Sequence, residues 1–98
     1  EDPEGAALRY EIELLRTDGE LAYSMGEAGD AFSSLHNAVD AAGAQGARWL
    51  ALKALHSLAV RFPDSAVRAQ LAGLAKELPS GRDLPAFRAA EAFLRETA

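Results

Sequence analysis

A chain of 98 residues is long enough to bury the core of one domain, and it leaves little room for a second. Almost half of the residues are apolar, alanine and leucine dominate, and aromatics are few, which favours closely packed helices over sheets. The formal charge of −5 opposes attraction to phosphate, so we expect no nucleic-acid partner.

The first predicted helix begins at Asp2-Pro3-Glu4, where a side chain can cap free amides and proline fits the first turn. We expect this helix to continue through Gly19, because a missing side chain on a buried stripe lets a neighbouring helix approach closely. A turn at Asp18-Gly19 is the alternative. The expected inner stripe advances by alternating steps of four and three: Leu8, Ile12, Leu15, Gly19, Ala22 and Met25.

A glycine-rich break at residues 26–29 precedes the second predicted helix, for which Asp30 is the expected cap. Phe32 and Val39 widen its inner face. The residues expected at the centre of that face are Ala31, Leu35, Ala38 and Ala42.

The third predicted helix runs from about Ala47 to Phe62 and is apolar nearly all round, so we expect it to be the most buried element. Phe62-Pro63-Asp64 is a predicted corner. Proline disfavours helical geometry at the preceding residue and cannot donate a hydrogen bond in a continuing helix.

The fourth and fifth predicted helices are joined by a connection at residues 79–83, and the fifth helix starts at about Leu84. The fourth helix is expected to bury Val67, Leu71, Leu74 and Leu78. The fifth is expected to present Phe87, Ala90 and Leu94 inward, with Phe93 beside them. Short links favour antiparallel neighbours, so the predicted fold class is all-α, with about five antiparallel helices. A right-handed hairpin array and a closed up-down bundle both satisfy this pattern.

Similar residues recur at an interval of 34, which is the period of helix-turn-helix repeats. Leu15, Gly19, Ala31, Leu35 and Ala38 correspond in this way to Trp49, Lys53, Ser65, Ala69 and Ala72. The first two hairpins, over about residues 12–79, resemble tetratricopeptide repeats, in which small residues let the helices approach. Lys53 departs from the pattern, since a small residue is usual there. The fifth helix takes the place of the family's C-terminal solvating helix.

The resemblance implies a non-enzymatic module that binds a protein segment on a concave side, lined by the first helix of each hairpin. In this role Tyr23 and Leu50 would be apolar anchors, and Arg16 could hold a carboxylate or a backbone carbonyl. The expected partner-binding residues are Glu13, Arg16, Glu20 and Tyr23 from the first helix with Leu50, Ala54 and Ser57 from the third. Family members that grip acidic C-termini use Lys and Asn on this face, so Glu13 and Glu20 argue against that ligand.

An assembly domain is the competing interpretation, either as a homodimer or docked to another part of the same polypeptide. Two repeats are fewer than the three or so that a free-standing array normally requires. The first and fifth helices would then form the interface.

Few residues invite catalytic or metal chemistry, and we expect no enzyme, no cofactor and no metal site. His36 and Asp40 stand one helical turn apart, but two ligands of mixed type leave most of a coordination shell empty. His56 could titrate near neutrality, although it lies in the most apolar helix. A small enzyme that joins His36, His56 and a carboxylate is the third possibility.

The chain has no cysteine, so it offers neither a disulfide nor a thiolate. No apolar run approaches the roughly 20 residues that a membrane-spanning helix needs, and no charged-then-apolar leader opens the sequence. We therefore expect a soluble protein, with the cytoplasm slightly favoured. The start at Glu1 rather than Met suggests a segment processed or excised from a longer protein.

Overall fold

The computed structural model describes residues 3–78 and 81–97, and its described residues form five helices and no strand. The helices are α1 (Pro3–Ser24), α2 (Ala28–Gln45), α3 (Arg48–Arg61), α4 (Ser65–Glu77) and α5 (Pro85–Glu96). The predicted all-α class with about five helices is therefore confirmed. Asp2, Pro79 and Ser80, which belong to a predicted cap and a predicted connection, lie outside the described residues.

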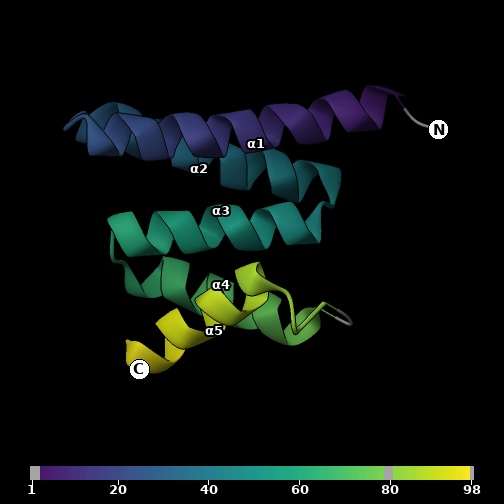
Figure 1. Cartoon of the computed structure of the whole chain (residues 1–98), viewed down its shortest axis with the longest axis vertical. Helices are drawn as coiled ribbons and strands as arrows, with labels where there is room; N and C mark the ends of the chain where they lie inside the picture. Colours follow the sequence, from purple (N-terminus) through teal and green to yellow (C-terminus); the bar gives the residue numbers. More distant parts are fainter. Residues whose placement is uncertain (1–2, 79–80, 98) are drawn as a thin grey trace.

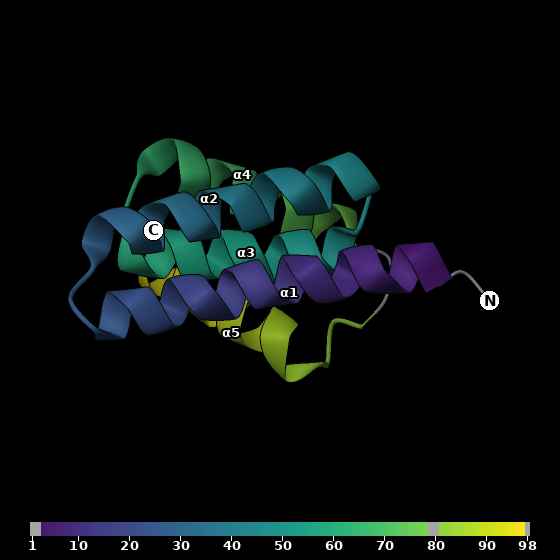
Figure 2. The same ribbon diagram turned by 90° about the horizontal axis from the view of Figure 1, so that it is seen from above.

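The helices form an open row with α3 at its centre. Successive helices pack against each other, and α3 also packs against α1 and α5. Figures 1 and 2 show α1, α3 and α5 toward one side and α2 and α4 toward the other. The molecule measures 40 × 35 × 21 Å, and its shortest dimension matches two layers of helices about 10–12 Å thick. Within the described residues α1 packs against neither α4 nor α5, whereas a closed bundle returns its last helix to its first.

Burial is concentrated on α3, which has more buried residues than any other helix in the described part of the chain. This confirms the prediction for the third helix. The main cluster of buried residues joins α3 to the C-terminal helices and contains Leu52, Leu55, Ala59, Leu71, Ala75, Leu78, Phe87 and Ala90. Between α1 and α2 the buried residues are mostly small, which brings these two helices close together.

Gly19 is buried within a continuous α1, as the sequence predicts. A Cβ atom at this position would lie only 2.7 Å from Cγ of Leu35 and 3.2 Å from the Leu35 backbone nitrogen. Glycine therefore permits the close approach of α1 and α2 at this point.

Several local predictions are wrong. Leu8 and Phe32, expected on the inner faces of the first and second helices, are 36% and 45% exposed. Asp30 does not cap α2, because the helix begins at Ala28 and its N-cap is Glu27, which leaves Asp30 in the first turn. An acidic side chain there is still favoured by the positive end of the helix. Met25 belongs to the turn after α1 and is 62% exposed, so it is not part of the inner stripe.

Gly19→Ala is expected to lower the free energy of unfolding by up to about 2 kcal/mol. Overpacking costs about 1–3 kcal/mol, and the gain of about 1 kcal/mol in helix propensity offsets only part of it. Gly73→Ala is the matched control, since Gly73 lies inside α4 with nothing within 4 Å of an added Cβ. It should raise stability by up to about 1 kcal/mol. Urea unfolding of both variants measures the difference, and equal shifts would contradict the close approach.

Candidate partner-binding surface

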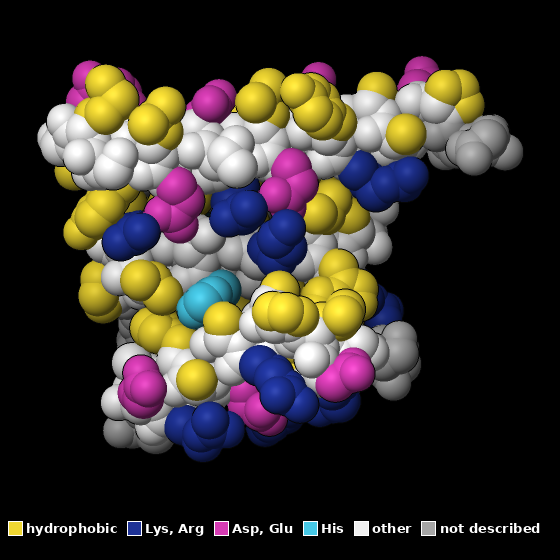
Figure 3. All heavy atoms as spheres, in the orientation of Figure 1, with side chains coloured by type: hydrophobic (Ala, Val, Ile, Leu, Met, Phe, Trp, Pro, Cys, Tyr) yellow, Lys and Arg dark blue, Asp and Glu magenta, His cyan; other side chains and the backbone are white. Residues whose placement is uncertain are grey.

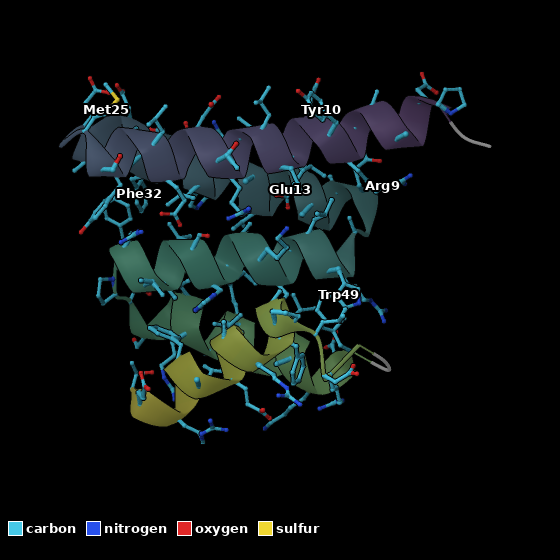
Figure 4. All side chains as sticks on the ribbon, viewed as in Figure 1. Arg9, Tyr10, Glu13, Met25, Phe32 and Trp49 are labelled. Carbon is cyan, nitrogen blue, oxygen red and sulfur yellow. The ribbon has the colours of Figure 1, made fainter. Side chains whose placement is uncertain are left out.

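A cluster of charged side chains links α1 to α3 and centres on Glu13. Oε1 of Glu13 accepts hydrogen bonds from Arg16, at 3.0 Å from Nη2 and 3.3 Å from Nε. Nζ of Lys53 lies 3.1 Å from the other carboxylate oxygen, Oε2, as an ion pair. Nη1 of Arg16 in turn reaches Oγ of Ser57 on α3, at 3.5 Å. Figure 4 shows Glu13 in the space between α1 and α3.

A second ion pair lies further along the same two helices, where Nε of Arg61 donates to Oε1 of Glu20 at 2.8 Å. Arg16 and Ser57, and likewise Glu20 and Arg61, are separated by 41 residues. Because this offset is constant, α1 and α3 run parallel. Partly exposed ion pairs contribute only about 0–1 kcal/mol each, so these contacts orient the two helices more than they stabilise the fold.

Glu13 and His56 are the two groups on this side with perturbed pKa values. Partial burial raises the pKa of Glu13, but the hydrogen bonds and charges of Arg16 and Lys53 outweigh it, so the pKa lies below its ordinary value of 4.5. His56 is half-buried, with its ring 5.6 Å from that of Phe93 on α5. Burial lowers the pKa of His56 below 6.5, against the opposing charge of Glu20.

Folding stability is expected to fall as the pH is lowered through 6.5 toward the folded-state pKa of His56. Within that window the unfolded chain binds more protons than the folded chain, so protonation favours unfolding. The depressed pKa of Glu13 adds a second loss below 4.5. Urea unfolding at a series of pH values should show a smaller slope in the upper window for His56→Gln than for the unsubstituted protein. A stability that increases on acidification through 6.5 would contradict the buried environment of His56.

Three aromatic rings meet at the end of this side, and we call Tyr23, Phe32 and Phe62 the aromatic cluster. The Phe62 ring lies between the other two, at centroid distances of 5.7 Å from Tyr23 and 5.3 Å from Phe32, both edge-on. The guanidinium carbon of Arg61 lies 4.8 Å from the Tyr23 ring centroid. Tyr23 is 38% exposed and Phe32 45% exposed, so two large aromatic surfaces face solvent from a fixed arrangement.

The predicted binding residues divide among three places. Glu13, Arg16, Glu20 and Ser57 are brought together in the contacts between α1 and α3, and Ser57 is buried there. Tyr23 belongs to the aromatic cluster. Leu50 lies half-buried in the first turn of α3, about 18 Å along that helix from Phe62, and Ala54 is fully buried.

Sequence reasoning missed Phe32 and Phe62 as site residues. Phe32 follows Ala31 on the predicted inner face, and Phe62 precedes the corner proline. Their size could have indicated this, because a phenylalanine ring is too large for the closely packed contacts that small residues make between neighbouring helices.

His36 and His56 do not share a site. Nδ1 of His36 lies 3.3 Å from Oδ2 of Asp40 on the exposed side of α2, and its ring is near Phe32. His56 lies instead against Phe93.

In residues 3–78 and 81–97 no three His, Asp or Glu side chains lie close enough together to bind a metal ion. No helix in this part of the chain combines the length and hydropathy required to span a bilayer.

No protein-family model, curated protein or solved structure matches this chain.

Proposed function

We propose that this protein is a non-enzymatic module that binds a segment of another protein along the side formed by α1 and α3. The aromatic cluster is the observation that carries the proposal. Tyrosine, tryptophan and arginine side chains are enriched among the residues that carry most of the binding energy at protein interfaces, because they bury a large area and also offer polar groups to the partner. Here the Phe62 ring packs between Tyr23 and Phe32, and the Arg61 guanidinium lies over the Tyr23 ring, so these groups are arranged before any partner arrives.

The geometry also suggests how long the bound segment is. Leu50 and the aromatic cluster lie at opposite ends of α3, about 18 Å apart. An extended chain of about six residues spans that distance. Between the two ends Arg16 has N–H donors beyond those bonded to Glu13 and Ser57, and these could hold a backbone carbonyl of the segment.

The arrangement of the helices supports a tetratricopeptide-like repeat as the framework for this function. Helices α1 and α3 are parallel and contact each other, and α5 contacts α3. Lys53, which departs from the repeat pattern, is half-buried because its amino group pairs with Glu13 on the neighbouring hairpin.

An assembly domain is the second candidate, as a homodimer or docked within a longer polypeptide. Leu14 and Leu21 on α1 and Met25 in the turn after it favour docking within a longer polypeptide, since exposed apolar side chains are a natural contact surface. Sedimentation equilibrium over a range of concentrations distinguishes a monomer from a homodimer.

Affinity capture with mass spectrometry identifies the partner, and a double variant then tests the surface. Tyr23→Ala with Phe32→Ala should weaken binding of that partner at least about tenfold while helicity is retained. Leu8→Ala with Leu84→Ala is the matched control, because both leucines are exposed outside the aromatic cluster. Undiminished binding by the folded aromatic variant would refute the assignment.

A further inference from the structure

Within the described residues only α2 and α3 pack against α1. The side of α1 that faces away from them nevertheless carries large apolar side chains. Tyr10, Leu14, Leu21 and Met25 are 69%, 45%, 59% and 62% exposed. Tyr10, Leu14 and Leu21 follow one another at steps of four and seven, which places them along one line of α1, and Met25 follows in the turn after the helix. We call these four residues the outer stripe. Figure 4 shows Tyr10 and Met25 pointing away from the rest of the molecule.

A hollow of about 170 Å³ opens beside the outer stripe and is lined by Glu11, Leu14, Leu15 and Asp18. These positions have the spacing i, i+3, i+4 and i+7. Four residues of one helix form this kind of hole when they receive a side chain from a facing helix. A cavity of about 150 Å³ is large enough for benzene, so the hollow can receive a leucine-sized group.

The edge of the outer stripe is acidic. Glu11 and Asp18 border the hollow, and Glu4 is exposed about two turns before Glu11. In Figure 3 yellow and magenta side chains alternate along the upper edge of the molecule, over α1, while dark blue ones lie lower, toward α3. A second copy of the chain would bring another Glu11 and Asp18 to the same contact, and like charges would then oppose it.

We propose that the outer stripe binds an amphipathic helix of another protein whose apolar face is bordered by Lys or Arg. An apolar side chain of that helix enters the hollow, and its basic residues pair with Glu11 and Asp18. The rest of its apolar face covers Tyr10, Leu21 and Met25. This surface is separate from the aromatic cluster, so the inference does not depend on the function proposed for the α1 and α3 side.

Three synthetic peptides of about 20 residues, long enough to follow α1, test the proposal on the full chain. The first carries leucines on one helical face with lysines beside them, the second has the same composition in scrambled order, and the third has glutamate in place of lysine. Fluorescence polarisation should show that the first peptide binds at least about tenfold more tightly than either of the others. Amide chemical shifts should change along residues 10–25.

Paired variants locate the contact. Leu14→Ala with Leu21→Ala should weaken binding of the first peptide at least about tenfold. Glu11→Gln with Asp18→Asn should also weaken it and reduce its dependence on salt. Glu77→Gln with Asp83→Asn changes the net charge by the same amount at exposed positions of the C-terminal half, and it should leave binding unchanged.

Three results would overturn the proposal. The first is that the scrambled or the acidic peptide binds as tightly as the basic amphipathic peptide, or that none of the three peptides binds. The second is an affinity for the basic peptide that the outer-stripe variants do not change. The third is a homodimer that Leu14→Ala with Leu21→Ala abolishes, because the occupant would then be a second copy of this chain.

Discussion

Replacing Leu52 by alanine is expected to lower the free energy of unfolding by about 2–5 kcal/mol. Leu52 is fully buried in the main core cluster. It lies on α3, which packs against all four other helices, so the cavity would weaken packing at the centre of the row. Small domains have a total stability of about 5–15 kcal/mol, and the variant would lose a large part of it.

Urea unfolding followed by circular dichroism measures this effect. Leu84→Ala is the control, because Leu84 is 49% exposed and its truncation should change stability by no more than about 0.5 kcal/mol. A similar small change for both variants would show that Leu52 is not in the core.

Phe87→Ala is expected to cost about 3–5 kcal/mol and to loosen α5 from the remaining helices. Phe87 is 3% exposed, and its ring is 6.3 Å from the ring of Trp49 on α3. Arg82 also lies over this ring, with its guanidinium carbon 5.1 Å from the centroid. Phe87 thus connects the first turn of α5 to α3 and to the segment that precedes α5.

Trp49 provides a direct measurement of this loss, since it is the only tryptophan of the chain. Its emission should shift to longer wavelength in Phe87→Ala as the indole becomes more exposed to water. Phe32→Ala is a matched control, because Phe32 is 45% exposed and lies in the aromatic cluster rather than beside Trp49. An unchanged emission spectrum in Phe87→Ala would contradict the contact between α3 and α5.

The helices could be predicted from the sequence because the signals are local. Pro63 follows closely after the last residue of α3, where it prevents the helix from continuing. Asp64 caps α4 by accepting hydrogen bonds from the backbone nitrogens of Ala66 and Val67. The position of Gly19 on the inner stripe also predicted the close contact with another helix. Asp30 misled the prediction, because residues that can cap a helix are equally suited to its first turn.

The candidate site was less predictable because its contacts join residues far apart in the chain. The interval of 34 identifies equivalent positions in two hairpins, but the polar side chains that pair between α1 and α3 are separated by 40 or 41 residues. Glu13 and Glu20 were expected among the partner-binding residues, and their pairing with Lys53 and Arg61 was not predicted.

The periodicity of the sequence also does not show which apolar side of α1 is buried. Helix α1 has apolar residues on two sides, and both sets recur at helical spacing. Only the packing of α2 and α3 decides that Ile12 is buried while Leu14 and Leu21 remain exposed.

The separation of α1 and α5 tests the open row of helices most directly. Because the chain has no cysteine, Asp18→Cys on α1 and Arg88→Cys on α5 allow spin labels at two defined positions. With α3 between them, the two helix axes should be about 16–20 Å apart, which is twice the usual spacing of packed helices. Pulsed electron paramagnetic resonance should give label distances consistent with that separation. Label distances that place the axes about 8–10 Å apart, as in direct helix packing, would mean a closed bundle and would contradict the open row.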